Sequence, residues 1–132
     1  MITDDFKQMV LDHMEIGFLE NIIDMFRADR SLFGIIPDMI QDERVRVRLG
    51  TAALVEELLI THPHDLETQI PALGRLLQSE QPTVRGDAAY ILGILRNKKA
   101  IAYLENASDD ENEAVREIVL EAIDEIRSSV PD

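Results

Sequence analysis

Residues 79–95 read SEQPTVRGDAAYILGIL, and this stretch decides the fold. From Val84 onward its apolar residues recur three and four positions apart, the spacing that places side chains on one face of an α-helix. Pro82 suits the first turn of such a helix, because the backbone N–H that proline lacks would have no partner there. The stretch therefore predicts a turn followed by an amphipathic helix.

The same pattern occurs in two other parts of the chain. Three segments that begin with Val-Arg align without gaps: VRLGTAALVEELL (47–59), VRGDAAYILGILR (84–96) and VREIVLEAIDEIR (115–127). Their spacings of 37 and 31 residues are typical of stacked supersecondary units. The positions expected to face the core are Val47, Thr51, Ala52, Val55, Leu58, Val84, Ala88, Ala89, Leu92, Leu95, Val115, Val119, Leu120, Ile123 and Ile126.

A shorter apolar helix is expected before each of these segments, over residues 36–41, 70–77 and 100–106. Each unit is thus a helical hairpin, and because no period-2 alternation competes, the chain is expected to be all-α. Asp110 and Glu113 have the spacing of a capping box at the start of the last helix. Residues 62–65, His-Pro-His-Asp, are expected to form a loop.

Residues 1–34 follow different rules of composition. All five Met and all four Phe lie in the first 39 residues. Helical periodicity remains, with Gly17 as the expected joint between two helices. Large, adaptable side chains suit a cap that covers the end of a repeat stack, and if exposed they would favour self-association as a homodimer through residues 1–34.

Composition excludes several classes of protein. The net charge is −13, which argues against general affinity for nucleic acid or for anionic membranes. With no Cys there is no disulfide, zinc-thiolate site or thiol nucleophile. The N-terminus lacks the cations of a signal peptide, and no apolar run is long enough to span a membrane. We therefore expect a cytoplasmic protein with no membrane partner.

The three copies resemble HEAT repeats, in particular the short bacterial kind also found in phycobilisome lyases. The resemblance covers about residues 35–128 and is clearest in the second copy. It implies an α-α superhelix: a short right-handed solenoid of three repeats (35–60, 65–97 and 98–128) behind the helical cap of residues 1–34, in one domain of residues 1–132. It also implies scaffolding or protein binding without catalysis, with a bilin-lyase-like enzyme or the regulatory subunit of an enzyme complex as the alternative.

The resemblance further implies a ladder in which a turn acid of one repeat binds the arginine of a neighbour. Carried over to this chain, the arginines are Arg48, Arg85 and Arg116, and the acids are Asp42 or Glu43, Glu80, and Asp110 or Glu111. The first copy also offers Val45-Arg46, but Val47-Arg48 aligns the later apolar residues better. A guanidinium satisfied by carboxylates serves the stacking; the alternative is an anion site at these arginines.

We expect no catalytic, cofactor or metal site in this sequence. No Ser lies in a glycine-flanked elbow, and no phosphate-binding loop is present. His62, His64 and Asp65 could supply metal ligands, but the intervening proline favours a solvated loop. The acidic residues 108–113 lack the central Gly of a calcium-binding loop.

A surface for a partner protein therefore remains. The solvent-facing positions of the second helices, expected on the concave side, are Glu57, Asp87, Tyr90, Ile94, Glu117, Glu121 and Glu125. Tyr90 is either an interface anchor or a packing residue between repeats. Residues 100–132 carry 2 cations and 10 acids, a net −8, so a partner with a basic surface is expected.

Overall fold

The computed structural model describes residues 2–129, and within this range it contains helices and turns and no strand. The all-α fold predicted from the sequence is thus confirmed. The chain divides into two compact units, Met1–Gln69 and Ile70–Asp132, which we call unit 1 and unit 2. The boundary falls inside the predicted repeat 65–97, just before its first helix. The assignment of one domain to residues 1–132 stays a prediction.

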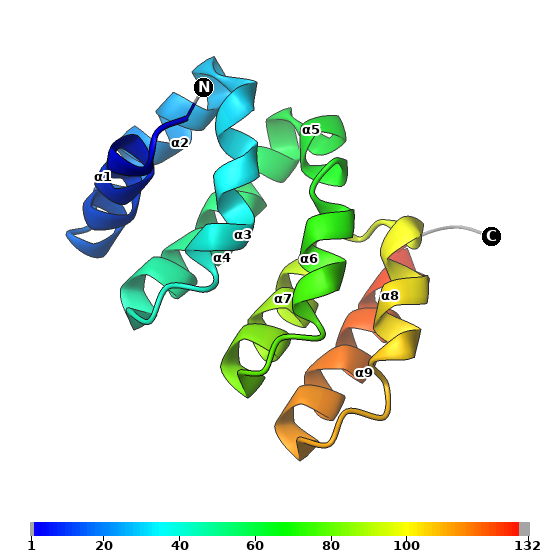
Figure 1. Cartoon of the computed structure of the whole chain (residues 1–132). Helices are drawn as coiled ribbons and strands as arrows, with labels where there is room; N and C mark the ends of the chain where they lie inside the picture. The colour runs from blue at the N-terminus through cyan, green and yellow to red at the C-terminus, as the bar shows by residue number, and fades with distance from the viewer. Residues whose placement is uncertain (1, 130–132) are drawn as a thin grey trace. The chain divides into compact units, whose positions relative to one another are not determined.

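Unit 1 is built around one long helix, α4. Its elements are α1 (Asp4–Glu15), α2 (Leu19–Ala28), the 3-10 helix η1 (Arg30–Ile35), α3 (Ile36–Met39), α4 (Val45–Thr61) and α5 (Pro63–Glu67). Helices α1, α2 and α3 pack against α4 (Figure 1). The hydroxyl of Thr3 caps α1 by accepting from the N–H of Phe6 at 3.1 Å. Gly17 joins α1 to α2 with φ +94°, a backbone conformation that favours glycine.

The Met and Phe side chains of the first 39 residues mostly lie inside unit 1. Phe26, Phe33, Met14 and Met39 are buried, whereas Phe18 is exposed at the turn between α1 and α2. These side chains form the core beneath α4. Among the four Phe residues, all of which are described, Phe18 alone is exposed, so self-association through residues 1–34 gains no support from an exposed aromatic cluster.

Unit 2 consists of two hairpins of the predicted kind. Its elements are α6 (Ile70–Leu76), α7 (Pro82–Leu95), the 3-10 helix η2 (Lys98–Ala100), α8 (Ile101–Asn106) and α9 (Glu113–Ser129). The second helices α7 and α9 lie side by side along most of their length (Figure 1). Small residues allow this approach: a Cβ at Gly93 would lie 3.0 Å from the Cβ and 3.1 Å from the Cα of Ala122.

The predicted core positions are buried, with two exceptions. Ala52 is half-buried, and Leu120 is 54% exposed, so its assignment to the core is wrong. Leu120 continues the apolar pattern of α9, but it lies past the edge of the face by which α9 packs against the rest of unit 2. No described element covers it.

Two local predictions are also wrong. Residues 63–67 form the short helix α5, because Pro63 opens a helix here as Pro82 does in α7. The last helix is capped by Asn112, whose Oδ1 accepts from the N–H of Val115 at 3.1 Å, and not by a box of Asp110 and Glu113. The Asp110 carboxylate instead accepts hydrogen bonds from Arg85.

The contact between α7 and α9 makes a testable prediction about two glycines. Gly93→Ala places a methyl group against the backbone of α9, so we expect the free energy of unfolding to fall by about 1–3 kcal/mol. Gly86→Ala is the matched control, since its methyl would meet only the terminal Cδ1 of Ile118, at 3.2 Å. There the gain in helix propensity, about 1 kcal/mol, should dominate. Urea unfolding of both variants measures the difference, and equal stabilities would contradict the assigned role of Gly93.

Candidate functional site

An arginine at the fourth position of each second helix holds the turn before it. In all three cases the guanidinium Nη1 donates to the backbone carbonyl oxygen six residues earlier. The distances are 2.9 Å for Arg48 to Asp42, 2.8 Å for Arg85 to Ser79 and 2.7 Å for Arg116 to Asp110. Val47 is buried whereas Val45 is exposed. The alignment of Val47-Arg48 with Val84-Arg85 and Val115-Arg116 therefore holds in the structure.

In unit 2, Arg85 also binds the turn of the following hairpin. Its Nε and Nη2 donate to the two carboxylate oxygens of Asp110 at 2.8 and 3.1 Å, and both side chains are 8% exposed. This bidentate geometry is the strongest form of an arginine–carboxylate pair. The hydrogen bonds from Arg85 hold the pKa of Asp110 below its usual range, and those to Asp110 raise the pKa of Arg85. Glu80, the other expected ladder acid, contributes its backbone carbonyl, 3.3 Å from Arg85 Nη1.

These contacts determine what the neighbouring groove can bind. The groove has a volume of about 470 Å³ and lies between the turns of the two hairpins of unit 2, with Arg85 and Asp110 in its wall. Every nitrogen of the Arg85 guanidinium already donates to a carboxylate or a carbonyl. The exposed charges in the wall are Glu80, Asp109 and Glu111. The groove is therefore acidic and does not offer Arg85 to an anion.

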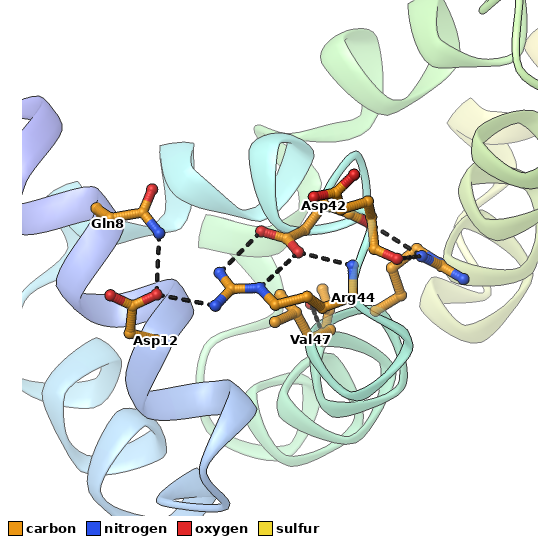
Figure 2. A network of polar contacts seen from close by, with 8 residues as sticks. Gln8, Asp12, Asp42, Arg44 and Val47 are labelled. Atoms are coloured by element: carbon orange, nitrogen blue, oxygen red, sulfur yellow. Dashed lines mark hydrogen bonds and ion pairs between the residues drawn. The ribbon is translucent and has the colours of Figure 1, made fainter.

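Unit 1 uses a different arginine, Arg44, which the sequence analysis missed. Figure 2 shows its guanidinium between two carboxylates. Arg44 donates to both oxygens of Asp42 at 3.0 and 3.1 Å and to Asp12 of α1 at 2.9 Å. These bonds lower the pKa of Asp42 and of Asp12. Arg44 precedes the repeated segment, so the alignment of repeats could not reveal its role. The only indication in the sequence was the carboxylate of Asp42, two residues earlier.

The structure brings most of the predicted partner-binding residues together in unit 2. Tyr90 is 53% exposed on α7, with Asp87 and Ile94 half-buried one turn to either side. On α9, Glu117, Glu121 and Glu125 are exposed. These three acids lie on the same side of α9 as Ile118 and Ala122. Ile118 lies against Gly86 of α7, and Ala122 lies against Gly93. Glu57 belongs to unit 1, where its Oε2 lies 3.6 Å from Nη2 of Arg27.

Of the acids on α9, Glu125 already has a partner. Its carboxylate lies 2.8 Å from Arg96 at the end of α7. Among residues 2–129, Glu117 and Glu121 form no ion pair. Of the three acids predicted to bind a partner on α9, Glu117 and Glu121 are therefore available to a ligand.

The sequence analysis missed a second exposed surface, on α4. Val45, Leu49 and Ile60 are exposed, and their spacing places them on one side of the helix. The signal was present, because α4 carries apolar residues on all sides and one helix face cannot accommodate them all. Glu56 interrupts this stripe.

No cluster of His, Asp and Glu that could hold a metal ion occurs in the described part of the chain. His62 instead approaches its neighbour Thr61, with Nδ1 2.8 Å from the hydroxyl oxygen. Within residues 2–129, no helix has the length and apolar character needed to cross a membrane.

The pair of Arg85 and Asp110 predicts a dependence of stability on pH. Asp110→Asn removes the charge that faces Arg85, so we expect Tm at pH 7 to fall by about 5 °C or more. Folding lowers the pKa of Asp110, so its stabilisation is present above the unfolded-state pKa, about 4, and is lost as the pH falls through the folded-state value. The difference in Tm between the two proteins should thus be steady from pH 7 to 5 and shrink below about pH 4.

Asp109→Asn provides the control for this experiment. Asp109 is exposed and precedes Asp110, so the substitution removes the same charge from the same turn. Its Tm should stay within about 2 °C of the wild-type value. Equal losses in the two variants would show that the pair contributes nothing beyond net charge.

Comparison with known proteins gives one finding that bears on this arrangement. The model of a family described as HEAT repeats matches residues 34–124. HEAT repeats are generally protein-interaction modules, and proteins built from them are typically non-enzymatic scaffolds. No curated protein matches the sequence. The more specific resemblance to phycobilisome lyases stays a prediction.

Proposed function

Because the chain belongs to the HEAT-repeat family, we propose that it binds a partner protein, without catalysis, through the solvent-facing side of α7 and α9. We call this surface the α7–α9 face. It comprises Asp87, Tyr90, Ile94, Glu117, Glu121 and Glu125. The exposure of Tyr90 on a helix that packs closely against its neighbour is the observation that carries the proposal.

Tyr90 has the properties of an interface anchor. A Tyr side chain has only two rotatable χ angles, so it loses little entropy on binding and buries a large area. Tyr103, the other Tyr of the chain, instead packs over Gly74 within unit 2 and is half-buried. Tyr90 is 53% exposed, so about half of its surface is available to a ligand.

The acids beside Tyr90 indicate the charge of the partner. Glu117 and Glu121 point their charges at solvent, and residues 100–132 carry a net −8. A partner with Lys and Arg opposite these acids would associate faster through electrostatic attraction, and would do so less at high salt. The proposal is therefore an aromatic anchor within an acidic rim, recognised by a basic protein surface.

Photo-crosslinking from position 90 tests this proposal. With p-benzoylphenylalanine in place of Tyr90, irradiation in host cells should yield a discrete adduct with another protein. Adding Glu117→Lys and Glu121→Lys reverses the charge of the rim, and should lower the yield about tenfold or more. Mass spectrometry of the adduct identifies the partner. The same probe at Ile60, on the exposed side of α4, is the control, and should not give this adduct.

Two results would contradict the proposal. One is the absence of any discrete adduct from position 90. The other is an adduct whose yield is unchanged by the two charge reversals, since this would separate the contact from the acidic rim.

A further inference from the structure

Arg96 ends α7 in a backbone conformation that arginine rarely adopts. Its φ is +50° and its ψ is +38°, which lie in the left-handed region. Among the residues that the structure describes, Arg96 is the one non-glycine residue with a positive φ. Glycine is the usual residue at such a helix end, because a Cβ there crowds the backbone. The benefit of an arginine at this position therefore lies in its side chain.

The side chain of Arg96 reaches an acid of the α7–α9 face. Its Nη2 lies 2.8 Å from Oε1 of Glu125. Glu125 is the last of three acids that follow one another at intervals of four residues along α9, after Glu117 and Glu121. Within residues 2–129, those two acids form no ion pair. Arg96 thus neutralises one of the three charges that the face would offer to a basic partner.

The pair of Arg96 and Glu125 differs from the pair that joins the hairpins of unit 2. Arg85 and Asp110 make two hydrogen bonds and are each 8% exposed. Arg96 and Glu125 make a single contact, and their side chains are 57% and 51% exposed. Exposed pairs contribute little to stability, because water and salt screen both charges. The pair of Arg96 and Glu125 can therefore open without loss of the fold.

We propose that Arg96 is an internal competitor for the cations of the partner. In the free chain its guanidinium occupies Glu125, and on binding a Lys or Arg of the partner replaces it. The inference rests on the proposed function, because it concerns the charges that the α7–α9 face offers. It adds a condition on the partner, which needs a cation placed to displace Arg96 from Glu125.

Lys98 allows competition to be separated from simple repulsion. It is exposed, lies two residues after Arg96 and carries the same charge. In the described part of the chain, Lys98 forms no ion pair with an acid of α9. Removal of either cation makes this end of unit 2 more acidic, but only the loss of Arg96 releases Glu125.

A fluorescein-labelled helical peptide, with Lys at every fourth position and Ala elsewhere, is the probe. Fluorescence anisotropy at low salt measures its Kd for the full-length chain. Arg96→Asn removes the guanidinium and keeps a residue that tolerates the left-handed backbone. We expect this variant to lower the Kd about threefold or more, and Lys98→Gln to lower it less than about twofold. In a chain that carries Glu125→Gln, Arg96→Asn should have no more effect than Lys98→Gln, because no acid is released.

Three results would overturn the inference. They are equal gains from Arg96→Asn and Lys98→Gln, a gain from Arg96→Asn that persists with Glu125→Gln, and the absence of peptide binding to every variant. Failure of the proposed function has a different signature. In that case the peptide would bind, but Glu117→Lys with Glu121→Lys would leave its Kd unchanged, because it would bind at another surface.

Discussion

The bond from an arginine in the first turn of each second helix to the turn before it is the interaction on which the repeats depend. It satisfies a main-chain carbonyl where the chain reverses, and it places the guanidinium at the edge of the hairpin. From that position Arg85 reaches Asp110 of the following hairpin. The bond to the Ser79 carbonyl thus positions Arg85 for its bond to Asp110 of the next hairpin. The buried guanidinium, which would be costly to bury alone, is satisfied by these partners.

The two units pack their helices together through different residues. In unit 2, glycines of α7 bring the second helices together, and Arg85 with Asp110 sets the register of the hairpins. In unit 1, the helices before α4 contribute larger side chains, and Gly50 makes room for Met14. Arg44 there replaces the arginine of a preceding repeat, binding Asp42 and reaching Asp12 of α1.

The surface that we propose for partner binding lies where the second helices of unit 2 face solvent. A helix in a stack contributes one face to the core, and its flanks to neighbouring repeats. On α9, the apolar side chain of Leu120 is 54% exposed, although its position in the repeat matches that of the buried Ala89 of α7. Where a second helix faces solvent, its exposed side chains are available to a partner, as Tyr90 of α7 is. Binding surfaces of this kind need no catalytic groups.

From the sequence alone, the Val-Arg period, the helical spacing of Val84 to Leu95 and the absence of strand patterns determined the all-α repeat fold. These signals are local, because a helix is formed by contacts within a few residues. Only the tertiary structure decided that Leu120 is exposed, that Arg44 binds Asp12, and that, among the residues described, Glu117 forms no ion pair while Glu125 does. Periodicity shows which residues share a helix face, but whether that face is covered, and by which charge, depends on segments distant in the chain.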